Sequence, residues 1–419
     1  MKKLISSTSI ALLLLSGSAW AETAAFYSVT NKADGNTIVG FKKEAGEYKK
    51  IGEFTTGGNG TGDLEIPALK KDDSHPLLNG DDPLISAGAL AATIGRNYMV
   101  VVNPGSSNIG LLEVKEDLGL ETVSTAPSSD RFPVSVAIYG EFVVAASVGN
   151  DNGSGSISAY TITADSKLEP IANSRRDLKA RPSTIAFSSD GEHVIVDELV
   201  TGKIKVFSMA RGNLSKEPVS VIDSPRKAES RFQAIPVGFT VRGNGGDDVL
   251  LVSEARFLTP DFKLREEKDK VPQSPLYSWQ TGSLSTYHLS DDGKNMSMIS
   301  GDVLTGSAVE GGEIANCWVA LSKDGNHLYA ANALSSSISR FDIDAKGAAK
   351  LDDVTAFKDQ SEALFFSDLE VSRDGKELYQ LVGNKGQIMV FDIDNDGGLK
   401  LKQTLDGLPQ LGTYGMLVY

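Results

Sequence analysis

Apolar and polar residues alternate along most of this chain, in short runs separated by clusters of Gly, Asp, Asn and Ser. Residues 317–322 and 327–332 show the pattern clearly, with Lys323-Asp-Gly-Asn326 between them. Alternation of this kind is typical of β-strands with one buried face, and Asp-Gly between two such runs is typical of a tight turn. No segment shows a convincing helical period. The pattern therefore predicts an all-β fold.

A six-residue phrase recurs seven times, with a Gly, Ser or Asn at its start, an aliphatic third residue and an aromatic or aliphatic sixth. The copies are Asn36-Thr-Ile-Val-Gly-Phe41, Ser107-Asn-Ile-Gly-Leu-Leu112, Gly155-Ser-Ile-Ser-Ala-Tyr160, Gly202-Lys-Ile-Lys-Val-Phe207, Gly282-Ser-Leu-Ser-Thr-Tyr287, Ser336-Ser-Ile-Ser-Arg-Phe341 and Gly386-Gln-Ile-Met-Val-Phe391. Apart from two longer intervals, they lie about fifty residues apart, a period typical of propeller repeats. Each repeat of a propeller forms one four-stranded sheet. The sequence therefore predicts a seven-bladed β-propeller.

The two ends of the chain complement each other. Residues 25–31 have the pattern of a second strand with no first strand before it, and residues 412–419 have that of an inner strand with nothing after it. Pairing them would complete one blade and remove two open sheet edges. We therefore expect an N-/C-terminal velcro closure, with residues 416–419 innermost.

Residues 1–21 have the pattern of a signal peptide. Lys2 and Lys3 precede an apolar run from Ile10 to Leu15, and Ala19-Trp-Ala21 is a small-x-small cleavage sequence. We expect cleavage before Glu22 and a periplasmic or secreted protein whose propeller covers residues 22–419.

The two long intervals between phrases predict insertions at about 57–83 and 256–280, and long insertions of this kind are usually functional or mobile.

The formal net charge of −14 disfavours nucleic acid and anionic membrane surfaces as partners, because both bind cationic patches. No apolar run after the signal segment is long enough to span a membrane. Cys317 is the only cysteine, which excludes an intrachain disulfide. The ring must therefore be held together by packing and closure.

Several phrases resemble the lactonase-type seven-bladed propeller family, which includes 6-phosphogluconolactonase and carboxymuconate cyclase-like proteins, and especially its exported bacterial members. They are Thr56-Gly-Gly-Asn-Gly-Thr-Gly62, Pro133-Val-Ser-Val-Ala137, Leu250-Leu-Val-Ser-Glu254, Asn316-Cys-Trp-Val319 and Ser335-Ser-Ser-Ile-Ser339. The resemblance covers nearly the whole chain after the signal segment. It implies the propeller fold and an activity on small lactones or sugar acids.

The resemblance also implies two site residues. Family members carry Arg-His-x-x-Phe-His-Pro followed by Asn-Glu-Leu, in which the Arg binds an anion and the Glu acts as acid or base. Here Phe187, Glu198 and Leu199 match, whereas Ser183 and Thr184 stand where the family has Arg-His. Arg181 lies two residues earlier and is the candidate anion ligand.

The ends of the predicted second strands carry polar residues in six of the seven blades: Asn31, Asn103, Glu198, Glu254, Asn332 and Asn384. Equivalent positions in a propeller are expected to form a ring near one mouth of the central channel. Glu198 and Glu254 replace Asn in neighbouring blades, which suggests a carboxylate pair for acid/base chemistry or a cation site. The alternative is that all six cap turns through side-chain hydrogen bonds.

Two further residues are candidates for the same mouth. Arg256 follows Glu254 and opens the second insertion, so that with Arg181 it could hold a carboxylate, the alternative being a local ion pair. His75 lies in the first insertion and is the only histidine that we consider as a base there.

Asp392, Asp394 and Asp396 match the opening of a calcium-binding loop, although Gln403 stands where an EF-hand requires Glu. Sister blades carry similar sequences at the same turn, which favours turn chemistry. No cofactor is required by the sequence, with a divalent cation (Ca²⁺ or Mg²⁺) as the open alternative.

The leading hypothesis is a periplasmic lactonase-like hydrolase for a small lactone or sugar acid. The alternative is a non-catalytic envelope propeller that binds a protein or glycan partner.

Overall fold

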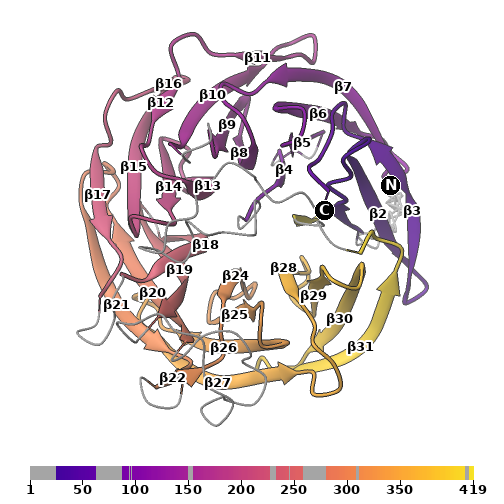
Figure 1. The fold of residues 1–419 in the computed structure, drawn as a ribbon, viewed down its shortest axis with the longest axis vertical. Helices are drawn as coiled ribbons and strands as arrows, with labels where there is room; N and C mark the ends of the chain where they lie inside the picture. The colour runs from indigo at the N-terminus through magenta and orange to yellow at the C-terminus, as the bar shows by residue number, and fades with distance from the viewer. Residues whose placement is uncertain are drawn as a thin grey trace, which may run out of the picture.

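The structure, a computed structural model, describes residues 25–62, 87–93, 95, 97–149, 154–226, 233–244, 246–257, 280–307, 311–410 and 415–419. These residues form seven sheets arranged in a ring, with no α-helix among them (Figure 1). The predicted seven-bladed β-propeller is therefore confirmed.

Each blade is described here from the centre of the ring outwards. Blade 1 contains β32 (Met416–Val418), β1 (Ala25–Val29), β2 (Thr37–Glu44) and β3 (Glu47–Thr55). Blade 2 contains β4 (Leu90–Ala92), β5 (Tyr98–Asn103), β6 (Asn108–Val114) and β7 (Leu120–Pro127). Blade 3 contains β8 (Pro133–Tyr139), β9 (Phe142–Ser147), β10 (Ser156–Ile162), and then β11 (Leu168–Pro170) and β12 (Arg176–Asp177). Blade 4 contains β13 (Pro182–Phe187), β14 (His193–Glu198), β15 (Lys203–Ala210), and then β16 (Asn213–Leu214) and β17 (Ser220–Asp223).

The remaining blades have four strands each. Blade 5 contains β18 (Ile235–Asn244), β19 (Asp247–Phe257), β20 (Gln280–Leu289) and β21 (Met296–Leu304). Blade 6 contains β24 (Asn316–Leu321), β25 (His327–Asn332), β26 (Ser337–Ile343) and β27 (Ala349–Lys358). Blade 7 contains β28 (Phe366–Val371), β29 (Glu377–Val382), β30 (Gln387–Ile393) and β31 (Leu399–Asp406). A small sheet of β22 (Gly306–Ser307) and β23 (Gly311–Gly312) links blades 5 and 6.

The recurring phrase forms the third strand of every blade, counted from the centre. Its aliphatic third residue is fully buried in all seven copies: Ile38, Ile109, Ile157, Ile204, Leu284, Ile338 and Ile388. Six apolar clusters each lie between two neighbouring blades, and a seventh, mainly between blades 6 and 7, extends to residues of blades 4 and 5. Burial of this repeated position is the physical reason why the phrase recurs.

The ring is closed by the two ends of the chain. β32 pairs with β1 in antiparallel register, with Val418 opposite Phe26 and Leu417 opposite Tyr27. The backbone N–H of Tyr419 donates to the carbonyl of Ala25 at 2.8 Å. The predicted velcro closure is confirmed, with β32 as the innermost strand of blade 1.

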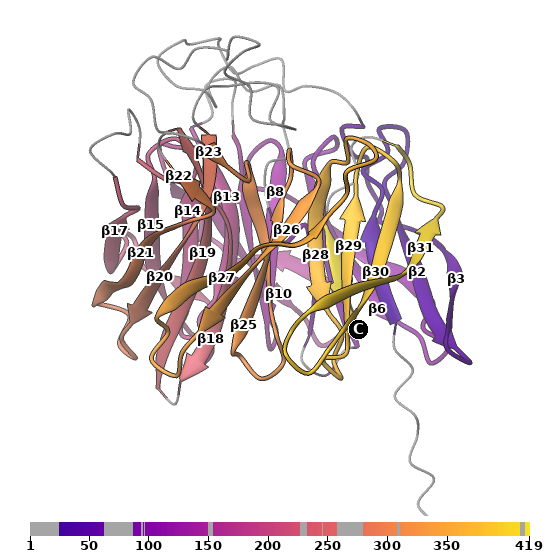
Figure 2. The same ribbon diagram turned by 90° about the horizontal axis from the view of Figure 1, so that it is seen from below.

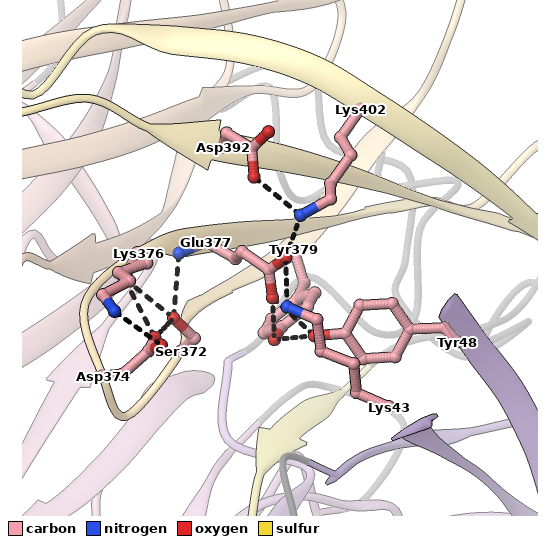
Figure 3. Close-up of polar contacts among 9 residues, drawn as sticks. All are labelled: Lys43, Tyr48, Ser372, Asp374, Lys376, Glu377, Tyr379, Asp392 and Lys402. Carbon is pink, nitrogen blue, oxygen red and sulfur yellow. Dashed lines mark hydrogen bonds and ion pairs between the residues drawn. The ribbon is translucent and has the colours of Figure 1, made fainter. Parts of the chain in front are cut away.

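A buried polar cluster reinforces this closure between blades 7 and 1 (Figure 3). The carboxylate of Glu377 accepts hydrogen bonds from Lys43 and Lys402, each at 2.7 Å, and from Tyr48 at 2.6 Å. Burial would raise the pKa of Glu377, but the hydrogen bonds from Lys402 and Lys43 outweigh it and lower the pKa to about 2. The cluster thus joins residues that are more than three hundred positions apart in sequence.

One face of the ring carries the connections from second to third strands and from each outer strand to the next blade. Figure 2 shows β22 and β23 at this face, which is uppermost there. Part of the first insertion lies here as well, since Gly60 donates to Lys32 of blade 1 and Gly105 of blade 2 donates to Asn59. The rest of that insertion and residues 258–279 lie outside the described residues, as does the signal segment. Within the described ranges, no helix is long and apolar enough to cross a membrane.

Candidate functional site

Glu254 and Arg256 lie on β19 of blade 5, near the upper face. Alternate residues of a strand point to the same side, so both side chains face blade 4. Both are buried, and Ser283 on β20 bridges them. Its hydroxyl donates to Glu254 Oε2 at 2.7 Å and accepts from Arg256 Nε at 3.1 Å. The two residues that sequence reasoning singled out therefore belong to one site.

The two carboxylate oxygens of Glu254 have different surroundings. Oε2 accepts from Ser283 and, at 2.8 Å, from Ser285. Oε1 is buried and makes no well-formed hydrogen bond within the described chain. Burial raises the pKa of Glu254, although Arg256 and the serines favour the ionised form. A carboxylate with a raised pKa and one uncommitted oxygen is suited to accept a proton.

Ser224 and Tyr287 complete what we call the Glu254 cluster: Glu254, Arg256, Ser283, Ser285, Ser224 and Tyr287. Ser224 follows β17 of blade 4 and is close enough to Glu254 and Tyr287 to favour the ionised form of each. Yet neither the Ser224 hydroxyl nor the Tyr287 hydroxyl forms a well-formed hydrogen bond with another described residue. The blade interface thus gathers three polar atoms that could exchange protons with a bound molecule.

Arg256 is already engaged within the protein. Its Nη1 donates to the carbonyl of Pro225 at 3.1 Å, and its Nη2 forms an ion pair with Asp302. Burial lowers the pKa of the guanidinium. The alternative of a local ion pair is therefore what the structure shows, except that the arginine is buried rather than exposed. Arg256 therefore holds the Ser283 hydroxyl and the Pro225 carbonyl in place.

Glu198 occupies the equivalent position in blade 4, but its carboxylate is neutralised. Lys205 forms an ion pair with Oε1, and Thr201 donates to Oε2 at 2.5 Å. Lys205 also donates to the carbonyl of Leu178 at 3.0 Å. Between Glu198 and Glu254, both in the described part of the chain, there is no hydrogen bond. Each glutamate thus makes its hydrogen bonds with a separate set of neighbours, and their acting as a carboxylate pair stays a prediction.

Arg181 belongs to the blade of Glu198. It precedes β13, its carbonyl accepts the backbone N–H of Leu199 at 3.0 Å, and its side chain is almost wholly buried. A joint anion site of Arg181 and Arg256 stays a prediction. His75 lies outside the described residues.

The asparagines at the strand ends are structural. The Oδ1 of Asn103 accepts from Asn36 at 2.8 Å and from Thr56 at 2.6 Å, both in blade 1. Asn332 donates to Ser337 and Ser339 at 3.1 and 2.8 Å. These hydrogen bonds cap turns and join neighbouring blades. They support the turn-capping alternative for these asparagines, and the ring at the channel mouth stays a prediction.

The aspartates of the calcium-like sequence shape a turn. Asp394 Oδ1 accepts from the backbone N–H groups of Asp396 at 2.9 Å and Gly398 at 2.7 Å, and Asp392 pairs with Lys402 at 2.8 Å. Over the described ranges, no group of three or more His, Cys, Asp or Glu side chains could hold a metal. The two backbone hydrogen bonds to Asp394 support the turn interpretation.

Sequence reasoning missed a second pair of carboxyl groups, Asp368 and Glu370, on the innermost strand of blade 7. Burial raises the pKa of Asp368 to about 7, and burial followed by the proximity of Asp368 raises that of Glu370 to about 8. Two acidic residues spaced by one in a short inner strand would have been the signal. Ser224 was missed because it follows an outer strand, and Tyr287 was missed because it completes the repeated phrase.

Comparison with known proteins supports the resemblance seen in the sequence. A family model described as lactonase, seven-bladed β-propeller, matches residues 319–406, which run from blade 6 to the end of blade 7. The structure is similar to a proposed 6-phosphogluconolactonase from Bacteroides uniformis, with a TM-score of 0.63 and 16% identity over 95% of this chain and 99% of that one. It is similar to a periplasmic gluconolactonase of Pseudomonas aeruginosa, with a TM-score of 0.63 and 14% identity over 94% and 98% of the two chains.

The same fold occurs in a hypothetical selenium-binding protein from Sulfolobus tokodaii, with a TM-score of 0.60 and 12% identity over 94% of this chain and 93% of that one. A comparison with curated proteins finds no significant match. At these identities the structural likeness establishes the fold, and the activity has to be argued from the site.

Proposed function

We propose that this chain, which resembles the lactonase-type seven-bladed propellers, is a hydrolase that opens a small lactone such as that of a sugar acid. The observation that carries the proposal is the state of Glu254. It is a buried carboxyl group with a raised pKa, with Oε2 held by two serines and Oε1 uncommitted. A general base for ester hydrolysis needs this combination of a fixed position and an available oxygen.

In the proposed reaction, an oxygen nucleophile bonds to the lactone carbonyl carbon while Glu254 Oε1 takes its proton. The ring C–O bond then breaks, and the ring oxygen leaves as a hydroxyl group after receiving a proton. The Tyr287 hydroxyl lies in the same cluster and can donate to the oxyanion that develops on the carbonyl. Ser283 and Ser285 keep Glu254 in position. The net products are those of adding one water to the lactone, a hydroxy acid.

The test is hydrolysis of a panel of sugar and aliphatic lactones by the purified protein and by Glu254→Gln. Loss of a general base typically costs about 10²- to 10⁴-fold in rate. We therefore expect the kcat of Glu254→Gln to be lower than that of the wild type by a factor in this range. Circular dichroism and thermal melting would confirm that the variant is folded.

Glu313→Gln is a matched control, because Glu313 is another buried glutamate at the same face, bound by Ser337 and Lys358. It should retain turnover when folded. Glu198→Gln tests the assignment that the family resemblance suggested. A folded Glu254→Gln protein with full turnover would contradict our assignment, and turnover lost only in Glu198→Gln would transfer the role to that residue.

A non-catalytic propeller that binds a protein or glycan partner is the second candidate. It is favoured by the ion pair of Glu198 with Lys205 and by Ser183 and Thr184, which replace the Arg-His of the lactonase-type sequence. No turnover of any lactone by the wild-type protein would favour this function.

We also propose that the protein acts in the periplasm or outside the cell. The support is the charged, apolar and small-residue pattern of residues 1–21. N-terminal sequencing of the protein recovered from a bacterial periplasmic extract should begin near Glu22. An intact Met1 on protein confined to the cytoplasm would overturn this proposal.

A further inference from the structure

Within the proposed lactone hydrolysis, on which this inference rests, we propose that the nucleophile is the hydroxyl group of Ser224. The reaction would then pass through a covalent acyl ester on this serine. Ser224 is not part of the repeated phrase, and it reaches the Glu254 cluster from the neighbouring blade.

The backbone holds Ser224 in a fixed place. Its N–H donates to the carbonyl of Gly202 at 2.7 Å. The carbonyl of the next residue, Pro225, accepts from Ala234 at 3.0 Å and from Arg256 Nη1 at 3.1 Å. The hydrogen bond from Arg256 therefore ties the serine of blade 4 directly to the strand that carries Glu254.

The Ser224 side chain is buried, with 2% of its surface exposed, and its hydroxyl makes no well-formed hydrogen bond among the described residues. It lies close to the Glu254 carboxylate, whose other oxygen is occupied by Ser283 and Ser285. Nucleophile, base and a third group that orients the base form the usual arrangement for activating a serine. Here the two serines of β20 take the orienting role.

The two steps balance without a further reactant. In the first, the Ser224 O–H proton moves to Glu254 Oε1, the serine oxygen bonds to the lactone carbonyl carbon, and the ring C–O bond breaks. The ring oxygen takes the proton from Glu254 and becomes a hydroxyl group. In the second, water gives a proton to Glu254 and attacks the ester. The bond to the serine oxygen breaks, this oxygen regains the proton, and the hydroxy acid is released.

The test uses an aliphatic β-lactone as an acylating probe on the full-length protein. Mass spectrometry of the intact chain and of its peptides should show one added lactone mass, located on Ser224. Ser224→Ala should abolish the label, and Glu254→Gln should slow labelling by at least tenfold. Ser147→Ala is the matched control, because Ser147 is 1% exposed and its hydroxyl also lacks a partner in the described structure.

Absence of label on Ser224 in the wild-type protein would overturn the inference, whatever the variants do. If Ser224→Ala does not fold, Ser224→Cys provides a second variant, whose thiol should be acylated at the same position. Lactone turnover that persists in folded Ser224→Ala would overturn the serine role and leave the proposed function intact. A wild-type protein that is neither labelled nor active would overturn both.

Discussion

The carboxylate of Asp368 accepts the backbone N–H of Met416 at 2.9 Å, so that blade 7 holds the first residue of the closing strand β32. The same side chain accepts the N–H of Leu369 at 2.9 Å. Glu370 follows two residues later, and it is Asp368 whose charge acts on it. A proton-binding pair therefore lies at the point where the ring closes.

This pair makes stability depend on pH. Carboxyl groups of the unfolded chain ionise near pH 4. The folded chain retains its protons up to about pH 7 at Asp368 and about pH 8 at Glu370. Their contribution to stability is therefore present below about pH 4 and is lost as the pH rises through 7 and 8. Glu370→Gln should raise the melting temperature at pH 8.5 by several degrees and change it little at pH 5.

Thermal melting of both proteins from pH 5 to pH 9 would check this prediction. Glu217→Gln, at an exposed position, is the control and should follow the wild-type curve. A constant difference between Glu370→Gln and the wild type across this range would contradict the proton linkage.

The buried polar cluster around Glu377 should have the opposite pH dependence: it should stabilise the protein at neutral pH and lose this contribution in acid. Because the pKa of Glu377 is lowered to about 2, its contribution is present at neutral pH and is lost as the pH falls through 2. Glu377→Gln removes the charge partner of Lys43 and one of the two partners of Lys402, which keeps Asp392, and it should cost about 1–3 kcal/mol of unfolding free energy at pH 7. Urea titration would measure this cost. Glu362→Gln, which removes only the half-exposed ion pair with Lys385, should cost at most about 1 kcal/mol.

Deletion of residues 412–419 should destabilise the whole ring. The deletion removes β32, exposes the inner edge of β1 and leaves Asp368 without the Met416 N–H. We expect a lower melting temperature and a broader transition by calorimetry. A truncated protein that melts like the intact chain would show that closure does not depend on this strand.

Glu198→Gln should act mainly on stability. It would leave Lys205, whose side chain is only 16% exposed, without its charge partner, and breaking a largely buried ion pair typically costs about 3–5 kcal/mol. The double variant Glu198→Gln, Lys205→Met should recover part of this loss, because no buried charge is left. Unfolding by urea would separate the two variants. Equal stabilities of single and double variant would indicate that the ion pair is not the cause.

A chelator should change neither stability nor turnover if the Asp394 loop is only a turn. Its Oδ1 already accepts two backbone N–H groups, and Asp392 is paired with Lys402. Melting with and without EDTA, before and after adding Ca²⁺, would test this. A melting temperature that rises with Ca²⁺ would restore the metal interpretation.

The fold was predictable because the same physical requirement is imposed seven times. Each blade must bury an aliphatic residue of its third strand, so the phrase containing Ile38 returns at Ile388. The closure was predictable because residues 25–31 and 416–419 each lack a neighbouring strand in sequence. Local patterns of this kind record burial and pairing within one blade.

The candidate site was predictable only in part. Glu254 and Arg256 were visible as charges at the end of an apolar strand. Ser224 was not, because its proximity to Glu254 arises across an interface between blades that no local pattern describes. Conversely, Glu198 has the same sequence position as Glu254 in its blade, and only the structure shows that Lys205 neutralises it.

The hydrogen bond between Tyr419 and Ala25 brings the last residue of the chain beside the start of β1. Joining them would need only a short linker, and the resulting circle would have no strand displaced. The order of blades along the chain is therefore one of several that fit the same ring. A circularly permuted chain opened at a turn such as residues 323–326 would keep every blade interface and would move the seam from blade 1 to blade 6.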